Sequence, residues 1–436
     1  MYIIKKIIKI LKIIRSLDSE TVVDIENIKI NINQQKNELI KIKKKNKILN
    51  KEKINVVFVC HEPQSWGSLK TVFETCYNDS DFNVTIVQIP VKRLVKGRKE
   101  SFEKYEDVGA EYFFKGFPCT IINGFDHKTN KWFDLRELEP DYLFFHIPYN
   151  SIRPPQYHSR IISGYTTLCF VHYAIGFSDV FKDTCPADFF NSIDILFCES
   201  EYNKKLYIEL DVLKPDVKLF LTGFPRFDNL NQYKNAESSI WKFCSNEKKF
   251  RIIWTPRWSI TEGTSHFIEF KDKILDFADK HSEMEFIFRP HPYAFYDLTQ
   301  RGIMRNKDIE LYKNEYFKRE NAHIDSEKEY LKQFYSSDVL ITDISTIIAE
   351  YFLTGKPIIY CHKKDCFNEF SRRLSEGFYW AHSWNEVVNY LHMLQCGNDP
   401  LREKRMEIIN SAYYIPDMGS GNKIKNILKE DFYKNG

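Results

Sequence analysis

Polar and ionisable side chains follow several short apolar runs in the first half of this sequence. They are His61, His146, His172, Glu199 and Arg226. If the runs are strands of a parallel sheet, these side chains lie at its ligand-binding edge, where the carboxyl ends of the strands meet. Imidazole is largely neutral at pH 7 and can accept a proton. We therefore predict that His172 is a general base, with His61 and His146 as secondary candidates at the same edge.

A second group of polar side chains follows apolar runs in the second half. Arg257 lies in a TPRW segment, and Arg289 and His291 lie in an RPHP segment. Guanidinium groups supply fixed positive charge to phosphate oxygens. We predict that both arginines bind a diphosphate and that His291 bonds or protonates the leaving phosphate. Whether His172 or His291 is the base stays open.

The segment SSDVLITDISTIIAEYFLTGKPIIYC (336–361) is predicted to form a strand, a helix and a strand. The helix is expected to begin at Ser345 or Thr346, where hydroxyls and free backbone N–H groups favour a bound phosphate. Glu350 either accepts hydrogen bonds from a ribose or alditol hydroxyl or is a solvated surface side chain. Asp343 either contacts the donor or caps the helix.

A Gly/Ser turn opens the last predicted helix, in DMGSGNKIKNIL (417–428). By the same argument about free N–H groups, Ser420 is a predicted phosphate contact, and Asp417 and Lys423 are further candidates.

The elements that position these residues alternate between apolar runs and helical stretches. Continuous β-branched runs such as INVVFVC (54–60) are typical of parallel strands buried on both faces. The alternation predicts an α/β fold with two Rossmann-like, doubly wound domains that face each other across a cleft. We place them at residues 54–235 and 236–436, because a polar linker follows residue 231.

Residues 1–53 are predicted to be a helical appendage outside both domains. In MYIIKKIIKILKIIRS (1–16), isoleucines fall on one helical face and lysines on the other. That composition is typical of a helix lying in an anionic membrane surface. The alternative is a helix packed on its own domain or on a partner.

A heptad pattern from residue 25 to residue 49 predicts a short coiled coil with lysines on its outside. Its a and d positions are Ile25, Ile28, Ile32, Gln35, Leu39, Ile42, Asn46 and Leu49. Apolar residues dominate these positions, and the polar exceptions can set register and oligomer state. We therefore expect a homo-oligomer, and a solvated helical linker is the alternative.

Composition and missing motifs narrow the function classes. A net charge of +3 over 436 residues gives no global field for nucleic acid. GxGxxG and GxxxxGK[ST] are absent, which disfavours dinucleotide dehydrogenases and P-loop NTPases. The ten cysteines form no CxxC pair, so we predict no obligatory metal; a loosely bound divalent cation at the diphosphate stays open.

Localisation is predicted from the lack of export signals. The sequence has no run of 18 apolar residues and no signal-type cleavage site. Together with the basic N-terminal segment, this predicts a cytoplasmic protein that is peripheral at the inner face of the cytoplasmic membrane.

Six segments together resemble the CDP-glycerol glycerophosphotransferase (teichoic acid polymerase) family. They are GFPR-D at 223–228, TPRW at 255–258, RPHP at 289–292, TDISTIIAEY at 342–351, GKPIIY at 355–360 and GSGNKI at 419–424. Their order and spacing also fit. The family usually carries a His–Gly–Thr–Pro-like segment in its first domain, and the nearest counterpart here begins at His172 and ends at Gly176.

The resemblance implies a GT-B architecture, with the donor held mainly by the C-terminal domain and the acceptor by the N-terminal one. It implies transfer of an alditol phosphate from a CDP-alditol to a hydroxyl of a cell-surface glycan, with release of CMP and no obligatory cofactor. The implied catalytic residues are His172 and His291. The implied donor-binding residues are Arg226, Arg257, Arg289, Thr342, Asp343, Ser345, Thr346, Glu350 and Ser420.

Two other functions fit the same residues. One is a GT-B glycosyltransferase that uses a nucleotide-sugar in capsule or lipooligosaccharide synthesis, since one fold serves both chemistries. The other is a membrane-tethered scaffold with an inactive GT-B body. The identity of the nucleotide that the protein binds and releases distinguishes these three functions.

Overall fold

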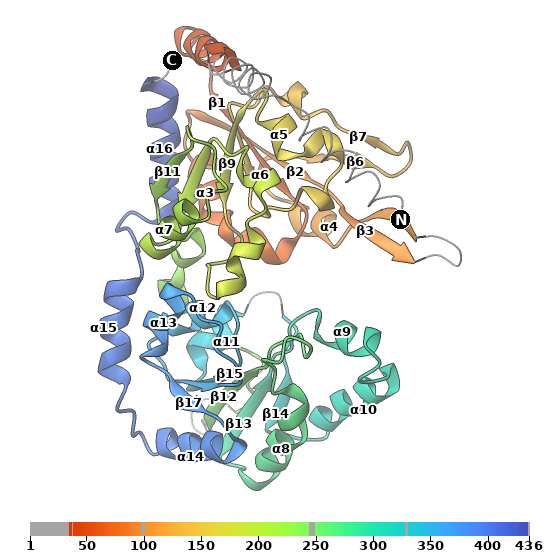
Figure 1. The fold of residues 1–436 in the computed structure, drawn as a ribbon, viewed down its shortest axis with the longest axis vertical. Coiled ribbons are helices and arrows are strands. Elements are labelled where there is room, and N and C mark those ends of the chain that lie inside the picture. Colours follow the sequence, from red (N-terminus) through yellow and green to blue (C-terminus); the bar gives the residue numbers. More distant parts are fainter. Residues whose placement is uncertain (1–34, 37, 97–100, 244–248, 328–329, 435–436) are drawn as a thin grey trace, which may run out of the picture.

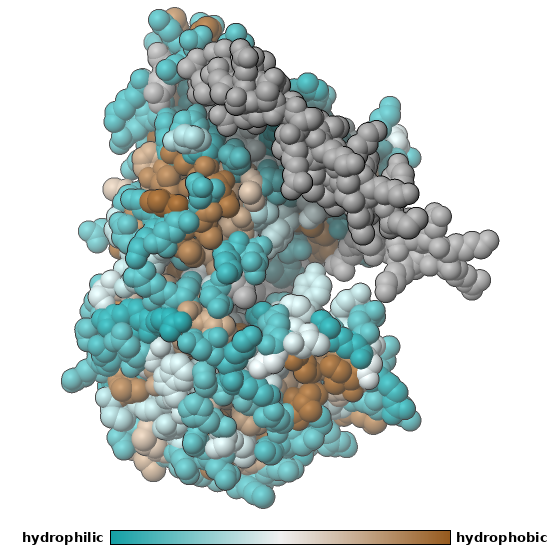
Figure 2. All heavy atoms as spheres, viewed as in Figure 1, coloured by the Kyte–Doolittle hydropathy of each residue, from teal (hydrophilic) through white to brown (hydrophobic). Residues whose placement is uncertain are grey.

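Two parallel sheets, one in each half of the chain, form the body of this computed structural model (Figure 1). It describes residues 35–36, 38–96, 101–243, 249–327 and 330–434. The predicted α/β class is confirmed, because every strand pair within the two sheets is parallel and helices connect the strands. On the face seen in Figure 2, hydrophilic residues cover most of the band where the two domains meet.

The first sheet has seven strands in the order β11-β10-β9-β8-β1-β2-β5. The strands are β1 (Ile54–Cys60), β2 (Phe82–Gln88), β5 (Thr120–Asn123), β8 (Tyr142–Phe145), β9 (Thr167–Val171), β10 (Ile195–Cys198) and β11 (Lys218–Leu221). The helices of this half are α3 (Lys70–Tyr77), α4 (Ala110–Phe114), α5 (Ser159–Ile162), α6 (Ala187–Phe190) and α7 (Glu201–Glu209). The sequence predicted these strands except β5, which lies in the aromatic-rich segment 105–139 that precedes β8.

Two antiparallel hairpins lie between β2 and β8 and were not predicted. They are formed by β3 (Val91–Lys96) with β4 (Ser101–Glu106), and by β6 (Phe125–Asp126) with β7 (Lys131–Trp132). Short 3-10 turns complete this half, among them η1 (Pro63–Ser68), η3 (Asn150–Ile152), η4 (Pro155–Tyr157) and η6 (Pro225–Phe227).

The second sheet has six strands in the order β14-β13-β12-β15-β16-β17. The strands are β12 (Phe250–Thr255), β13 (Met284–Phe288), β14 (Ala322–Ile324), β15 (Val339–Thr342), β16 (Ile358–Cys361) and β17 (Tyr379–Ala381). The helices are α8 (Phe267–Lys280), α9 (Ala294–Gln300), α10 (Asn306–Phe317), α11 (Leu331–Ser336), α12 (Ile347–Phe352), α13 (Glu369–Ser375), α14 (Trp384–Gln395) and α15 (Arg402–Ala412). Short edge strands β14 and β17 were not predicted.

An apolar cluster joins the two domains. Ile175, Phe177 and Phe224 of the first half lie in one buried cluster with Ile344 and Phe370 of the second half. The loop after β9 also crosses between the domains, since the backbone N–H of residue 179 donates to the carbonyl of residue 366 at 3.0 Å. The two sheets are therefore held against each other by core packing as well as by polar contacts.

The final helix returns to the first domain. Figure 1 shows α15 and α16 (Ser420–Lys434) running along one side of the molecule, with α16 beside the first sheet. Ile424, Leu428 and Phe432 share one face of α16 and are buried in the first domain's core cluster. The predicted C-terminal domain of residues 236–436 is thus wrong at its end, because this apolar stripe is covered by α3 and its neighbours.

The described part of the appendage is a helix docked on the first domain. Residues 38–49 are helical. Lys36 pairs with Asp194 at 2.8 Å, and Lys47 pairs with Asp141 at 2.7 Å. Both aspartates directly precede strands of the first sheet, so the helix lies along the edge opposite the strands' carboxyl ends.

The third contact of this helix is buried. Lys44 is 3% exposed, and its Nζ contacts the Asp431 carboxylate at 2.6 Å and the Tyr142 hydroxyl at 2.9 Å. The expectation that the lysines all face outward is therefore wrong for these side chains, because acidic groups of the domain body pair with them. The predicted amphipathic helix of residues 1–16 lies outside the described residues. Where the structure is described, it contains no helix both long and apolar enough to cross a membrane.

The predicted heptad seam faces away from the body. Leu39, Ile42 and Leu49 are 62%, 56% and 71% exposed, and Gln35 and Asn46 are exposed as well. The lysine contacts fix the opposite face of the helix on the domain. The coiled coil itself stays a prediction.

Replacing Asp431 by asparagine should destabilise the first domain. Burial opposes ionisation of its carboxyl, but Lys44, Lys218 and Tyr142 outweigh burial and lower the pKa of Asp431 to about 2. Asparagine keeps the shape and leaves Lys44 buried without its counter-charge, which costs about 3–5 kcal/mol. We expect that loss in the free energy of urea unfolding at pH 7, with Glu430→Gln as the exposed neighbouring control.

The pH dependence of the same pair has a defined sign. A depressed folded-state pKa stabilises the protein above the unfolded value and stops doing so as pH falls through about 4 toward 2. The difference between wild type and Asp431→Asn should therefore shrink as pH is lowered through this window. A variant as stable as Glu430→Gln at pH 7 would contradict the role of this ion pair.

Candidate active site

Three predicted donor-side residues meet where β12 and β13 end. Arg257 follows β12, and Arg289 and His291 follow β13, its neighbour in the sheet. Desolvation of the ring is the largest effect that lowers the pKa of His291, to about 4. The positive charges of Arg257 and Arg289 lower it in the same direction. The His291 ring also stacks on Trp258, with centroids 5.8 Å apart. The result is a positively charged strand-end site with a neutral imidazole.

The hydrogen bond to His291 fixes which ring nitrogen carries its proton. The backbone N–H of Tyr293 donates to Nδ1 of His291 at 3.1 Å, so the neutral ring has its proton on Nε2. His291 can therefore donate a hydrogen bond from Nε2 to a phosphate oxygen. It does not offer a free lone pair there, which favours the predicted phosphate contact over a role as base.

Neighbouring groups within the second domain hold the Arg289 side chain in place. Its guanidinium pairs with the buried carboxylate of Asp325 and donates to the carbonyl of Glu327 at 2.9 Å. The same group lies 4.5 Å from the ring centroid of Tyr330. These contacts hold the positive charge at the strand end, where it acts on His291.

Arg226 and Glu350 meet across the domain boundary. Arg226 Nη1 lies 3.5 Å from Glu350 Oε1, and the Tyr330 hydroxyl donates to Glu350 Oε2 at 2.8 Å. Glu350 is buried, so the expectation of a solvated surface glutamate is wrong. Tyr330 links this pair to Arg289 and was missed by the sequence, since only packing between α11, α12 and η6 brings it there.

Asp343 positions a loop of the second domain. One carboxylate oxygen accepts hydrogen bonds from the backbone N–H groups of Arg257 at 2.9 Å and His266 at 3.0 Å. The other lies 2.7 Å from Nδ1 of His266. The sequence predicted that Asp343 either contacts the donor or caps the next helix. In the structure the partners of its carboxylate all come from the loop after β12 instead. His266 carried no local signal in the sequence.

Thr342 is a strand-end residue with its hydroxyl already used. It is fully buried, and its Oγ1 donates to the carbonyl of Thr255 at 2.9 Å, on the paired strand β12. The predicted donor contact of Thr342 is therefore wrong for the structure described, because the side chain points between β12 and β15.

The predicted phosphate seat at the next helix is half-exposed. α12 begins at Ile347, and Thr346 precedes it without a side-chain capping bond. Thr346 is exposed and Ser345 is partly buried, with its hydroxyl 3.4 Å from the backbone nitrogen of Ile347. Both hydroxyls thus remain near the strand end, and donor binding by them stays a prediction.

The predicted phosphate seat at the last helix is occupied by the protein itself. The Asp228 carboxylate accepts hydrogen bonds from the backbone N–H groups of Ser420 at 2.6 Å and Gly421 at 2.8 Å. A Cβ atom at Gly421 would lie 2.5 Å from the backbone of Thr71, so only glycine permits this approach. The backbone N–H groups on which the prediction for Ser420 rests are thus bonded to a carboxylate of the GFPR-D motif, and donor binding by Ser420 stays a prediction.

Three histidines line the corresponding edge of the first sheet. His61, His146 and His172 follow β1, β8 and β9, which are adjacent strands. All three are buried, and burial is the largest effect lowering the pKa of His172, to about 3. The backbone N–H of Ala174 donates to Nδ1 of His172 at 3.2 Å, which leaves the ring proton on Nε2. This tautomer does not present a lone pair at Nε2.

Glu199 lies at the end of β10, the next strand in the same sheet. Burial raises its pKa to about 7, although hydrogen bonds from Gly176 and Asn203 oppose the shift. The Asn203 side chain donates to Oε1 of Glu199 at 2.6 Å. Glu199 thus anchors the loop after β9 and is not paired with His172.

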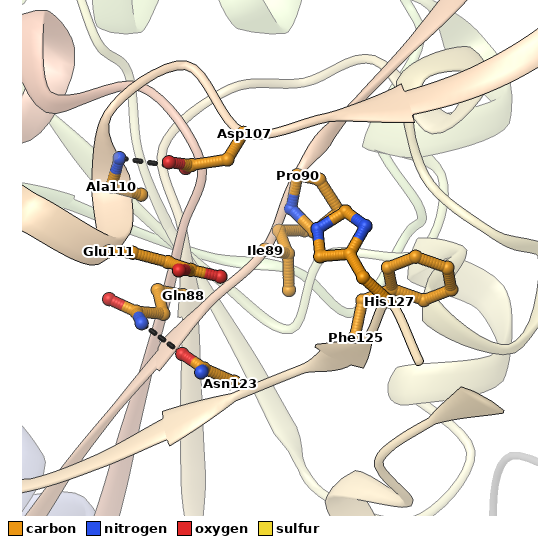
Figure 3. Close-up of a pocket in the computed structure, with 9 residues that line it drawn as sticks. All are labelled: Gln88, Ile89, Pro90, Asp107, Ala110, Glu111, Asn123, Phe125 and His127. Carbon is orange, nitrogen blue, oxygen red and sulfur yellow. Dashed lines mark hydrogen bonds between the residues drawn. The ribbon is translucent and has the colours of Figure 1, made fainter. Parts of the chain in front are cut away.

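Two hollows lie near these edges. One is lined by residues of both domain faces, among them Gly67, Lys70, Arg226, Tyr233 and Leu331. The other lies beyond β2 and β5 and is lined by Glu111, His127 and other polar and apolar side chains (Figure 3). Only the first contains a predicted site residue. Within the part of the chain that is described, no group of three His, Cys, Asp or Glu side chains is arranged to hold a metal ion.

Residues 190–380 match the family described as CDP-Glycerol:Poly(glycerophosphate) glycerophosphotransferase. The family resemblance predicted from the motifs is confirmed. The matched range contains Arg226, Arg257, Arg289, His291 and Glu350, and it begins after His172. The family match therefore coincides with the donor-side cluster.

One curated relative is the minor teichoic acid biosynthesis protein GgaB of Bacillus subtilis (strain 168). It is 22% identical over 365 residues, which cover 74% of this chain and 38% of GgaB. This chain thus spans well under half the length of that relative.

Solved structures with this fold include the wall teichoic acid polymerase TagF and a UDP-N-acetylglucosamine 2-epimerase. A TagF variant matches with a TM-score of 0.56 and 11% identity, covering 91% of this chain and 98% of that one. The putative epimerase from Listeria monocytogenes matches with a TM-score of 0.56 and 14% identity, covering 88% and 97%. At these identities the likeness establishes the fold, which is GT-B as predicted.

Replacing Asp343 by alanine should loosen the loop after β12. Alanine has no oxygen to accept the hydrogen bonds that one carboxylate oxygen receives from the backbone N–H groups of Arg257 and His266, and losing a bond to a charged group costs about 1.5–3 kcal/mol. We expect those two backbone amides to exchange hydrogen roughly tenfold faster or more, measured by mass spectrometry. Asp365→Ala, at an exposed aspartate, is the control, and equal exchange in both variants would contradict the bracing role.

Proposed function

We propose that this protein transfers an alditol phosphate, such as glycerol phosphate, from a CDP-alditol to a hydroxyl of a cell-surface glycan. The observation that carries the proposal is the coincidence of the family match with the Arg257–Arg289–His291 cluster. TagF, which shares the fold, has a structure from a CDPG soak, and that supports a CDP-linked donor in this chain too. GgaB is a teichoic acid biosynthesis protein, which supports a glycan acceptor.

The proposed reaction is an in-line displacement at phosphorus. A hydroxyl oxygen of the acceptor forms a bond to the β-phosphorus of the donor as the bond from that phosphorus to the bridging oxygen breaks. CMP leaves with the bonding electrons, and the hydroxyl proton passes to a base. A divalent cation at the diphosphate belongs to the proposal as an option that metal titration of CMP release would decide.

The donor-side residues suit this displacement. Arg257 and Arg289 hold positive charge at the ends of adjacent strands, where the diphosphate would lie. His291 carries its proton on Nε2 and would donate to an oxygen of the departing CMP. His291 therefore acts in this proposal on the leaving group. The base is His61 or His146 of the first sheet, since His172 as bonded here presents no lone pair at Nε2.

Removal of His291 should abolish most of the turnover. With purified protein, CDP-glycerol and a glycan acceptor, we expect acceptor-dependent CMP release by His291→Ala to fall roughly 100-fold or more, the usual effect of losing an acid–base group. His392→Ala, an exposed histidine on α14, is the matched control and should retain wild-type rates.

The same assay with other CDP-alditols and with nucleotide-sugars as donors tests the class of enzyme. Release of UDP from nucleotide-sugars, with CDP-alditols inert, would replace the proposal by the glycosyltransferase. Absence of any nucleotide binding would replace it by the inactive scaffold. A His291→Ala variant with unchanged CMP release would remove His291 from the mechanism.

We also propose that the N-terminal appendage pairs two copies of the chain at an anionic membrane surface, which places the enzyme at the inner face of the cytoplasmic membrane. The exposed seam of Leu39, Ile42 and Leu49 supports the pairing, since nothing in the described body covers it. In a parallel pair, Glu38 would lie near Lys43 of the partner helix, an attractive contact. The basic residues of 1–16 support the membrane contact.

A charged seam should separate the copies. The double variant Leu39→Glu, Ile42→Glu places carboxylates at the proposed contact and should elute as a monomer, measured by light scattering. Leu311→Glu, at an exposed apolar position on α10, is the control. A wild-type protein that is already monomeric would overturn the pairing. Loss of vesicle binding on deletion of residues 1–16 tests the membrane contact separately.

A further inference from the structure

A buried positive charge lies beside the histidines of the first sheet. Arg153 follows β8 in the segment of η3 and η4, and it is 1% exposed. His61 and His146, at the ends of the paired strands β1 and β8, are 1% and 0% exposed. The ring centroids of His61 and His146 are 6.3 Å apart, and the Arg153 guanidinium bonds the carbonyl of Ile147, next to His146 in the chain. The charge of Arg153 also lowers the pKa of both histidines, after the larger effect of burial.

These groups leave several polar atoms without partners. Both ring nitrogens of His61, Nε2 of His146, and Nε and Nη1 of Arg153 are buried, and the described part of the chain offers them no hydrogen-bond partner. Arg153 Nη2 donates to the carbonyl of Ile147, and the guanidinium lies 4.0 Å from the ring centroid of Phe145. Buried polar atoms are normally bonded, so this cluster of unpaired atoms on adjacent strand ends points to a polar partner that is not part of the described chain.

The charge of Arg153 is not balanced by a carboxylate in the described part of the chain. Among the described residues, no carboxylate forms an ion pair with it, and burial is the cause that lowers its pKa, to about 9. The guanidinium therefore remains charged at neutral pH, whereas burial lowers the pKa of His146 to about 3 and keeps that ring neutral. An isolated buried charge costs several kcal/mol, and a bound anion would offset that cost.

His146 has the tautomer that His172 lacks. Its Nδ1 lies 3.1 Å from the carbonyl of Ser65, which can only accept, so Nδ1 carries the proton. The Ser68 hydroxyl lies 3.2 Å from the same nitrogen and donates its own proton to the Ser65 carbonyl, which fits this tautomer. Its Nε2 therefore presents a lone pair and can accept a hydrogen bond from a hydroxyl. A positive group and a hydrogen-bond acceptor thus lie together at one strand edge.

We propose that Arg153, His61 and His146 form an anion subsite on the acceptor side, which binds a phosphate group carried by the acceptor. Arg153 supplies the charge and free N–H groups, His61 supplies an N–H donor, and Nε2 of His146 accepts from a hydroxyl of the same acceptor. Because these groups are buried, the proposal requires the η3–η4 segment that carries Arg153 to move when the anion enters. The subsite rests on the proposed phosphotransferase function and deepens it by assigning residues to the acceptor.

The deciding variant is Arg153→Met, tested in the full chain. Methionine fills similar apolar space beside Phe145 and removes an uncompensated charge, so the thermal midpoint should stay level or rise. Binding of glycerol 3-phosphate, the probe, should weaken at least tenfold in calorimetry at saturating CDP, which blocks phosphate binding at the donor site. Arg160→Met, an exposed arginine on α5, should change neither quantity.

Kinetics give a second readout. With a phosphate-bearing acceptor, Arg153→Met should raise the KM for the acceptor roughly tenfold or more and leave the KM for CDP-glycerol unchanged. Arg153→Lys keeps a positive charge without the planar fork and should recover part of the loss. A phosphate-free acceptor should show little difference between the variants and wild type.

The outcomes separate this subsite from the proposed function. A fall in thermal midpoint with unchanged binding of glycerol 3-phosphate would make Arg153 a structural residue and overturn the subsite. Equal effects of Arg153→Met and Arg160→Met would also overturn it. Failure of the wild-type protein to bind CDP would sink the phosphotransferase, whatever Arg153 does.

Discussion

Parallel pairing within the two sheets is the constraint on which the rest of this structure depends. Parallel strands need helical crossovers, bury both faces, and bring every carboxyl end to one edge. In the second sheet that geometry places Arg257 beside Arg289 and His291, although 28 residues lie between β12 and β13 in the chain. In the first sheet it places His61, His146 and His172 on adjacent strand ends. Neither cluster would exist with antiparallel neighbours, whose ends alternate.

Charged side chains at the opposite edge of the first sheet hold the N-terminal appendage. Asp141 and Asp194 directly precede strands, and each accepts a lysine from the appendage. Together with Asp431, these two aspartates dock the basic helix on the first domain. The apolar seam is consequently turned outward, so one short helix presents a polar face to its own body and an apolar face to the surroundings.

Carboxylates of the protein occupy positions that a motif assigns to ligands. Asp228 holds the N-terminal N–H groups of α16, and Asp343 holds the loop after β12. Both residues lie in segments that look like phosphate-binding motifs in the sequence. A free N–H group binds any nearby anion, and a side chain tethered at the right distance competes well with a diffusing phosphate. Such motifs therefore mark anion-binding backbone without telling which anion is bound.

The sequence by itself determined the fold class, most strands and the group of family motifs, because apolar runs and short motifs are local signals. It also located Arg257, Arg289 and His291 at strand ends, since each directly follows an apolar run. Tertiary structure alone decided the return of α16 to the first domain, the burial of Glu350 against Tyr330 and the inward lysines of the appendage. It also decided the tautomers of His146 and His172, which depend on one backbone group each. These features arise from contacts between residues far apart in the chain, and the free energy of such a contact is not encoded in the neighbours of either residue.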